Sequence, residues 1–177
     1  MQSLIRLFLD IAMHRRGPED VPHSGTVLVL ALAAYLATGA LALVPGDQPV
    51  LPRLLLDASM LVLFMGALLV FTGRGARMMQ TLAALLGTGA LLTAASVPFV
   101  WLAYSAVDAE GQAAANDPVV LGSSLALIGL LGFSLLVTGH IVRSAMDWPY
   151  AGGVLVAVVY FGLSVEVFRR LFPEGAG

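Results

Sequence analysis

The chain has 177 residues and a net charge of −2, and 59% of its residues are hydrophobic while only 11% are charged. This composition, with a mean hydropathy of +0.91, lies far from that of soluble domains and indicates an integral membrane protein. The absence of cysteine excludes disulfides, thiolate nucleophiles and iron–sulfur or thiolate–zinc sites, and the small net charge gives no reason to expect a nucleic-acid partner.

The chain begins with a short amphipathic helix that cannot span a bilayer. Two interpretations are open: the helix lies in the headgroup plane, with Arg6, Arg15 and Arg16 at the membrane surface, or it docks on a helix bundle. Gly17 and Pro18 end this helix, and a polar linker follows. The expected apolar face consists of Leu4, Ile5, Phe8, Ile11 and Ala12, opposite Ser3, Arg6, Asp10 and His14.

Five long apolar runs follow, and each has enough residues, at about 1.5 Å per residue, to cross a hydrocarbon core about 30 Å thick. Turn residues separate the runs. We therefore predict an all-α fold, with an amphipathic helix and linker in residues 1–25 and one membrane domain of five transmembrane helices in residues 26–177. The expected spans are 26–44, 51–71, 81–103, 119–142 and 151–168.

Small residues recur on one face of the third and fourth spans, at spacings of three and four. This pattern is typical of membrane helices whose backbones approach a neighbour closely. We predict that both faces serve helix packing. The two stripes are Ala83, Gly87, Ala90 and Ala94 in the third span and Gly122, Ala126 and Gly129 in the fourth.

The arginines predict the orientation, because cytoplasmic segments of membrane proteins are enriched in positive charge. With the N-terminus inside, six arginines are cytoplasmic and three are external, and the acidic loop 105–117 lies outside. We expect a multi-pass protein of a bacterial inner membrane, with a cytoplasmic N-terminus and a periplasmic C-terminus. The cytoplasmic set is Arg6, Arg15, Arg16, Arg74, Arg77 and Arg143, and the external set is Arg53, Arg169 and Arg170.

Five closely spaced spans, an N-terminal segment with Gly17-Pro18 ahead of the first span and a short tail resemble the layout of bacterial members of the Yip1 family. The resemblance covers the whole chain in layout and implies an all-helical membrane protein, of a family linked in eukaryotes to vesicle trafficking and small GTPases. It carries over no catalytic residue.

Charged residues inside a membrane are costly and are functional candidates. Asp57 lies four residues after Arg53, and Glu166 lies three and four residues before Arg169 and Arg170. In the predicted topology the two carboxyl groups lie at similar depth in the outer part of the bilayer. We predict one charge network of these five residues; the alternative is a proton or cation site.

His140 and Arg143 lie near the inner end of the fourth span. A bis-histidine haem needs two intramembrane histidines, and the sequence offers only His140. A three-histidine metal site with His14 and His23 requires the N-terminal segment to fold back. We therefore expect no cofactor and no metal, and a His140 that hydrogen-bonds to a neighbouring helix or to headgroups.

Two functional hypotheses follow. The first is a non-enzymatic membrane protein that acts through helix packing with membrane partners, including a second copy of itself, or through organisation of the lipid bilayer. The second is a small transporter or channel that uses Asp57 and Glu166 in the membrane. No serine, histidine and acid stand at one membrane depth, so we do not expect an enzyme.

Overall fold

A computed structural model describes residues 4–45, 49–106 and 117–172 of the chain. The protein is all-helical in these ranges, and five of its helices are long and apolar enough to cross a membrane, which confirms the predicted fold class. Most of the acidic loop 105–117 lies outside the described residues. The elements are α1 (Leu4–Ala12), η1 (Pro18–Asp20), α2 (Gly25–Leu43), α3 (Val50–Phe71), η2 (Gly75–Arg77), α4 (Met78–Ser105), α5 (Pro118–Met146) and α6 (Tyr150–Leu171).

α4 and α5 are longer than the apolar runs from which we predicted them, because polar caps and connections add helical turns. At the start of α5 the Asp117 side chain accepts a hydrogen bond from the Val119 N–H (2.7 Å), with Pro118 at the first helical position. Both choices favour a helix start. α5 then continues through the predicted end at Val142 to Met146, and Asp147 ends it in the left-handed conformation (φ 56°).

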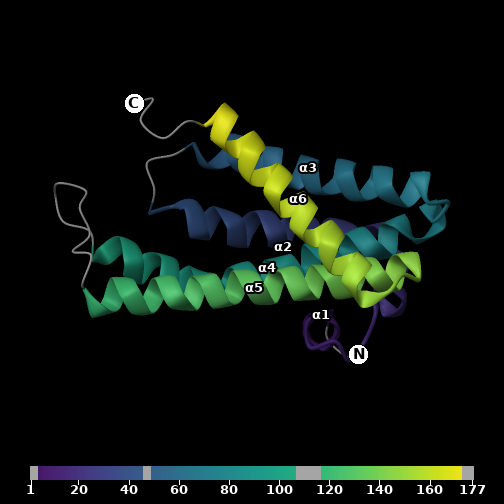
Figure 1. The fold of residues 1–177 in the computed structure, drawn as a ribbon, viewed down its shortest axis with the longest axis horizontal. Coiled ribbons are helices and arrows are strands. Elements are labelled where there is room, and N and C mark those ends of the chain that lie inside the picture. The colour runs from purple at the N-terminus through teal and green to yellow at the C-terminus, as the bar shows by residue number, and fades with distance from the viewer. Residues whose placement is uncertain (1–3, 46–48, 107–116, 173–177) are drawn as a thin grey trace.

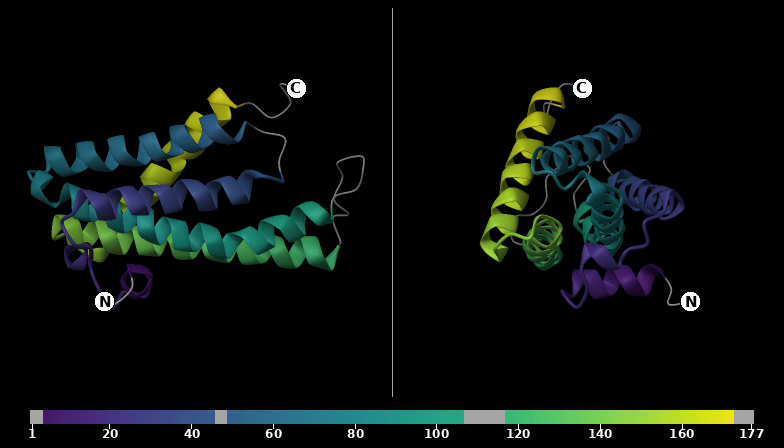
Figure 2. Two further views of the ribbon diagram at one scale, coloured as in Figure 1. Left: turned by 180° about the vertical axis from the view of Figure 1, so that it is seen from behind. Right: turned by 90° about the vertical axis from the view of Figure 1, so that its right-hand side faces the viewer.

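α4 is the central helix, and α1, α2, α3 and α5 all pack against it. α6 starts against α5 and then crosses the bundle diagonally, so that its last turns approach α3 (Figure 1). Figure 2 shows α1 lying on the side of the bundle, against α4 and α5 and near one end, outside the set of long helices. We call this end the N-terminal end, and the opposite end, where α6 finishes, the C-terminal end.

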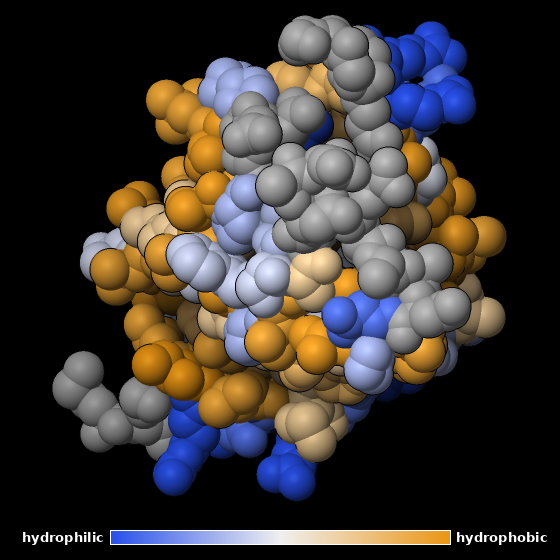
Figure 3. Space-filling view, turned by 90° about the vertical axis from the view of Figure 1, so that its left-hand side faces the viewer, coloured by the Kyte–Doolittle hydropathy of each residue, from blue (hydrophilic) through white to orange (hydrophobic). Residues whose placement is uncertain are grey.

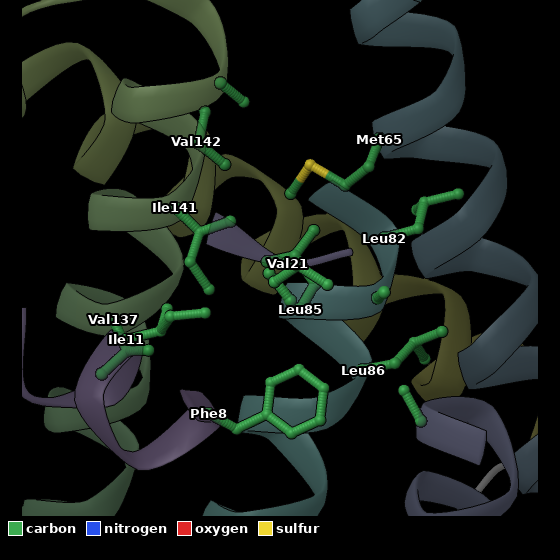
Figure 4. Packing of buried hydrophobic residues seen from close by; sticks show 14 of the residues in the cluster. Phe8, Ile11, Val21, Met65, Leu82, Leu85, Leu86, Val137, Ile141 and Val142 are labelled. Atoms are coloured by element: carbon green, nitrogen blue, oxygen red, sulfur yellow. The ribbon is translucent and has the colours of Figure 1, made fainter. Parts of the chain in front are cut away.

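The hydrophobic core is concentrated at the N-terminal end. Ile11 of α1, Leu69 of α3 and Ile141 of α5 are fully buried there, beside Leu86 of α4 and Val21 of the linker. Figure 4 shows side chains from α1, α3, α4 and α5 converging on this core. The C-terminal end contributes few residues to it, because α6 has diverged from α5 there.

α1 docks on the bundle and does not turn its whole apolar face toward lipid. Leu7, Phe8, Ile11 and Ala12 are buried against α4 and α5, whereas Ile5, expected on the same face, is 60% exposed. The buried face is therefore rotated relative to the expected one, since Leu7 replaces Ile5. Arg16 pairs with Asp10 (3.6 Å) and Arg15 is exposed, so the side chains of both residues remain near the surface of the molecule.

Gly87 provides a close approach, but to α1 and not to another long helix. A Cβ atom at Gly87 would lie 2.5 Å from the Phe8 ring, and one at Gly89 would lie 2.9 Å from the ring of Tyr35 in α2. Ala83 and Ala90 are buried on α4, and Ala94 is exposed. At Gly87, the predicted stripe therefore packs against the Phe8 ring of the short helix α1.

A close backbone contact lies between α5 and α6, where Gly139 faces Gly153. A Cβ at Gly139 would meet the Val154 backbone at 2.9 Å, and one at Gly153 would clash with the Gly139 carbonyl. The predicted stripe on α5 lies elsewhere: Gly122 and Gly129 have no atom within 4 Å of a built Cβ, and Ala126 is partly exposed. In the described part of one chain, those two glycines make no such close contact.

Two arginines join the α3–α4 connection to the α5–α6 connection at the N-terminal end. Arg74 pairs with Asp147, and Arg77 Nη1 lies 3.2 Å from Asp147 Oδ1. Arg77 also donates to the Ser144 and Ala145 carbonyls (3.2 and 3.1 Å), which are among the last acceptors of α5. The hydrogen bonds from Arg77 and then Arg74 hold the pKa of Asp147 below its ordinary value.

Candidate functional site: a cavity at the C-terminal end

A cavity of about 770 Å³ lies between α2, α3 and α6, with one residue of α4 in its wall. Its volume lies within the range of about 300–1,000 Å³ that is usual for small-molecule sites. At this end of the bundle α6 has left α5 and approaches α3 (Figure 1). Figure 3 looks onto this end of the bundle and shows hydrophobic side chains around much of its outline, as expected for surfaces in contact with acyl chains.

The wall of the cavity is mostly apolar. Three residues near the end of α2 contribute to it, Gly39, Ala42 and Leu43, and α3 contributes Leu54. Leu54 packs closely on Gly39, where a Cβ would meet its methyl group. From α6 come Val165 and Phe168, and Phe172 follows that helix. Four charged or hydroxyl-bearing side chains interrupt this surface in addition to Thr93: Tyr35, Arg53, Asp57 and Arg169.

Asp57 is hydrogen-bonded to a tyrosine and not to the arginine one turn earlier. The Tyr35 hydroxyl of α2 donates to Asp57 Oδ2 of α3. The helical spacing of four brings Arg53 and Asp57 to the same cavity, but among the described residues no ion pair joins them. A hydroxyl donor therefore partly offsets the cost of placing the carboxyl group within the bundle.

Arg53 faces the cavity with part of its hydrogen-bonding capacity unused. Its guanidinium carbon lies 5.1 Å from the centre of the Phe172 ring, a cation–π contact. The Nε atom is buried and has no hydrogen-bond partner among the described residues. An arginine offers five N–H donors in a planar fork. Arg53 therefore has donors in this wall for which the described residues supply no acceptor.

Glu166 forms a separate cluster at the end of α6. Its two carboxylate oxygens accept hydrogen bonds from Arg169 and Arg170, each at 2.6 Å. The two arginine side chains are exposed and Glu166 is partly exposed, and only Arg169 of the three lines the cavity. The single network predicted from the sequence is thus divided in two: Glu166 is already shared by two arginines on its own helix, and Asp57 is bonded to Tyr35.

His140 lies at the opposite end of the bundle, where the N-terminal segment folds back onto α5. Its Nε2 lies 2.8 Å from the Arg16 carbonyl oxygen, and its ring centre lies 4.5 Å from that of His14. Arg143 stacks on the ring of Tyr150, 5.8 Å from its centre. Within the described ranges no three His, Asp or Glu side chains are close enough together to hold a metal ion.

A smaller, polar cavity of about 410 Å³ lies at the N-terminal end, beside the pair formed by Arg77 and Asp147. Arg143 and Glu19 also line it. Arg77 and Asp147 in its wall already form an ion pair that links the α3–α4 connection to the α5–α6 connection. We therefore assign this cavity a structural role.

Tyr35 and Phe172, the partners of Asp57 and Arg53, are not among the site residues predicted from the sequence. Tyr35 is the only tyrosine in the first apolar run, and a hydroxyl in such a run is itself a signal, because it needs a polar partner in lipid. Nothing in the sequence showed that the partner would be Asp57, since this depends on how α2 and α3 pack.

Comparison with known proteins gave no match: no family model, no curated protein and no solved structure is similar to this chain.

Proposed function

We propose that this integral membrane protein is non-enzymatic and acts by holding a molecule from the bilayer in the cavity between α2, α3 and α6, and thereby organises bilayer components. The observation that carries the proposal is the cavity itself: it is mostly apolar, it lies at one end of a five-helix bundle, and charged groups face it. An apolar site with a few convergent polar groups is the usual form of a binding site.

We further propose that the protein resides in a bacterial inner membrane with the N-terminal end of the bundle in the cytoplasm. The support is the arginine distribution. Arg74, Arg77 and Arg143 all lie at the N-terminal end with the N-terminal segment, whereas Arg53, Arg169 and Arg170 lie at the C-terminal end. The cavity then opens in the periplasmic leaflet. Membership of the Yip1 family stays a proposal that rests on layout.

Filling the cavity tests the proposed function. Ala42→Trp places an indole in the cavity wall, and Ala37→Trp places the same side chain on an exposed position of the same helix. We expect protein extracted in a mild detergent to retain membrane molecules, seen as added mass in native mass spectrometry. Ala42→Trp should lose this mass and Ala37→Trp should keep it; equal retention by the two variants would refute the proposal.

The second candidate function is ion or proton transport through Asp57. The observation that favours it is that Asp57 faces the cavity beside Tyr35, as an acidic group in a transport pathway would. Glu166 is a weaker candidate for this role, because it does not line the cavity and both of its carboxylate oxygens are bonded to Arg169 and Arg170. An ion-flux assay in liposomes discriminates the two functions. Ion flux through the parent protein that Asp57→Asn abolishes, at equal incorporation of the two proteins, supports transport. If the parent protein gives no ion flux, the result supports binding.

A further inference from the structure

The charges that face the cavity indicate the chemistry of its ligand. Arg53, in the first turn of α3, and Arg169, in the last turn of α6, come from two helices that meet at the C-terminal end. Both side chains contribute to one cavity wall. The apolar part of the wall, including Ala42 and Leu54, continues from them. A molecule that matches this wall has an anionic group at one end and an apolar chain.

The donors of Arg53 make the anionic group specific. Its flat face rests on Phe172 and its Nε is enclosed by protein atoms, whereas its two Nη groups make no hydrogen bond to the described residues and therefore remain for a ligand. Arginine forms paired hydrogen bonds with phosphate or carboxylate oxygens, and such charge-assisted bonds are the strong ones. A phosphodiester has two charged and two ester oxygens arranged tetrahedrally, so arginines from two helices can approach it in different planes, whereas a planar carboxylate presents both oxygens in one plane.

The acidic groups indicate where the headgroup stops. Asp57 lies one turn further along α3 than Arg53, with one of its oxygens engaged by Tyr35. A carboxyl group at that point disfavours deeper entry of an anion. Glu166 is bonded to Arg169 and Arg170, so within the described ranges this carboxylate is not free to pair with the ammonium of a zwitterionic headgroup.

We propose that the cavity binds a phospholipid with a net-anionic headgroup: its phosphodiester lies between Arg53 and Arg169, and an acyl chain lies along the apolar wall formed by α2, α3 and α6. This inference rests on the proposed function and names the class of ligand. It assigns Arg53 and Arg169 as binding residues and Phe172 as the residue that positions the Arg53 guanidinium.

The test measures lipid binding to delipidated full-length protein in a non-ionic detergent, by titration in native mass spectrometry. The probes are phosphatidylglycerol, phosphatidylcholine with the same acyl chains, and oleic acid. We expect phosphatidylglycerol to bind about tenfold more tightly than phosphatidylcholine, because both lipids offer the same phosphodiester but only phosphatidylcholine brings a cationic ammonium group near Arg53 and Arg169. Arg53→Gln should remove most of the difference, and Arg53→Lys, which keeps the charge, should restore part of it.

The chain contains a matched control. Arg169 and Arg170 are adjacent, equally exposed and equally bonded to Glu166, and only Arg169 lines the cavity. Arg169→Gln should weaken binding of phosphatidylglycerol several-fold, and Arg170→Gln should leave it unchanged. Both positions lie on the surface of α6, so this comparison holds even where Arg53→Gln perturbs the fold.

Failure of this inference and failure of the proposed function give different results. If Ala42→Trp lowers the binding of no probe, the cavity is not a binding site and both fail. If Ala42→Trp lowers binding of all three probes while Arg53→Gln and Arg169→Gln leave the lipid preference intact, the cavity binds amphiphiles without reading their charge, and this inference alone is overturned. Tighter binding of oleic acid than of phosphatidylglycerol overturns the choice of a phosphodiester.

Discussion

At the scale of single residues, the partners of the buried polar groups decide what the groups can do. Asp57 takes its hydrogen bond from Tyr35, and Arg53 rests on Phe172 with a donor unused. An arginine and an aspartate one helical turn apart usually suggest an ion pair. Here Asp57 accepts a hydrogen bond from Tyr35 on another helix, so Arg53 is available to bind the proposed ligand.

The Tyr35–Asp57 hydrogen bond gives the first prediction. Tyr35→Phe removes one oxygen and leaves the carboxyl group of Asp57 without its donor, which should lower the free energy of unfolding by about 1–3 kcal/mol. Tyr104→Phe, at an exposed tyrosine, is the control and should cost little. The measurement is unfolding in detergent by circular dichroism.

A double-mutant cycle checks whether the tyrosine or the arginine is the true partner of Asp57. We expect a coupling energy between Tyr35 and Asp57 that exceeds the coupling between Arg53 and Asp57. The reverse order would mean that Arg53 and Asp57 form an ion pair in the membrane, as the helical spacing alone suggested.

At the scale of elements, the five long helices were predictable from the sequence, and their partners were not. Apolar runs of sufficient length follow directly from the thickness of the bilayer. We predicted a stripe at Gly87 for packing between membrane helices, whereas the close neighbour of Gly87 is Phe8 of α1, because α1 folds back onto α4. The Gly139–Gly153 contact was not predicted, because the sequence has 19 glycines and many of them could equally well form a close helix contact.

The docking of α1 gives the second prediction. Gly87→Leu should displace Phe8 and destabilise the protein by about 1–3 kcal/mol, as overpacking of a filled contact typically does. Trypsin should then cleave more rapidly after Arg15 and Arg16. Gly122→Leu is the control, because no atom lies within 4 Å of a Cβ there; equal thermal shifts for the two variants would contradict the docking of α1.

The ion pairs of Arg74 and Arg77 with Asp147, which link the two connections at the N-terminal end, give a prediction about pH. Arg77 and Arg74 hold the pKa of Asp147 below its ordinary value near 3.8. A lowered pKa in the folded state means that the contribution to stability is present above the ordinary value and is lost as the pH falls through the folded-state pKa. The loss should begin below about pH 4 and be small, because Asp147 is exposed.

Asp147→Asn isolates this charge, because asparagine also tolerates the left-handed backbone found at position 147. The melting temperature of the variant should lie below that of the parent protein at pH 7, and the difference should narrow at pH 3. A difference that does not change between these pH values would show that the charge of Asp147 is not what stabilises the connection.

At the scale of the whole molecule, the two ends of the bundle differ. The N-terminal end is filled by a core from α1, the linker, α3, α4 and α5, whereas the C-terminal end contains the cavity. The sequence showed which charged residues gather at the C-terminal end, because spans alternate in direction. It did not show the cavity, whose wall depends on the diagonal course of α6 (Figure 1) and on Phe172, which follows that helix.

Orientation is tested by reporter fusions. One placed after Gly177 should be periplasmic and one at Gly75, in the connection between α3 and α4, should be cytoplasmic. The reverse result would place the cavity in the cytoplasmic leaflet and overturn the proposed localisation of its mouth, while leaving the binding proposal open to its own test.

The most direct test of the central claim is whether an acyl chain occupies the cavity. Leu54 is 7% exposed and lines the cavity, Leu69 is fully buried in the core, and Leu55 is 50% exposed on the same helix as both. Nuclear Overhauser effects between lipid acyl protons and leucine methyl groups should therefore appear at Leu54 and Leu55 and be absent at Leu69. If Leu54 instead behaves like Leu69 in the presence of phosphatidylglycerol, the cavity does not hold a lipid and the account is wrong.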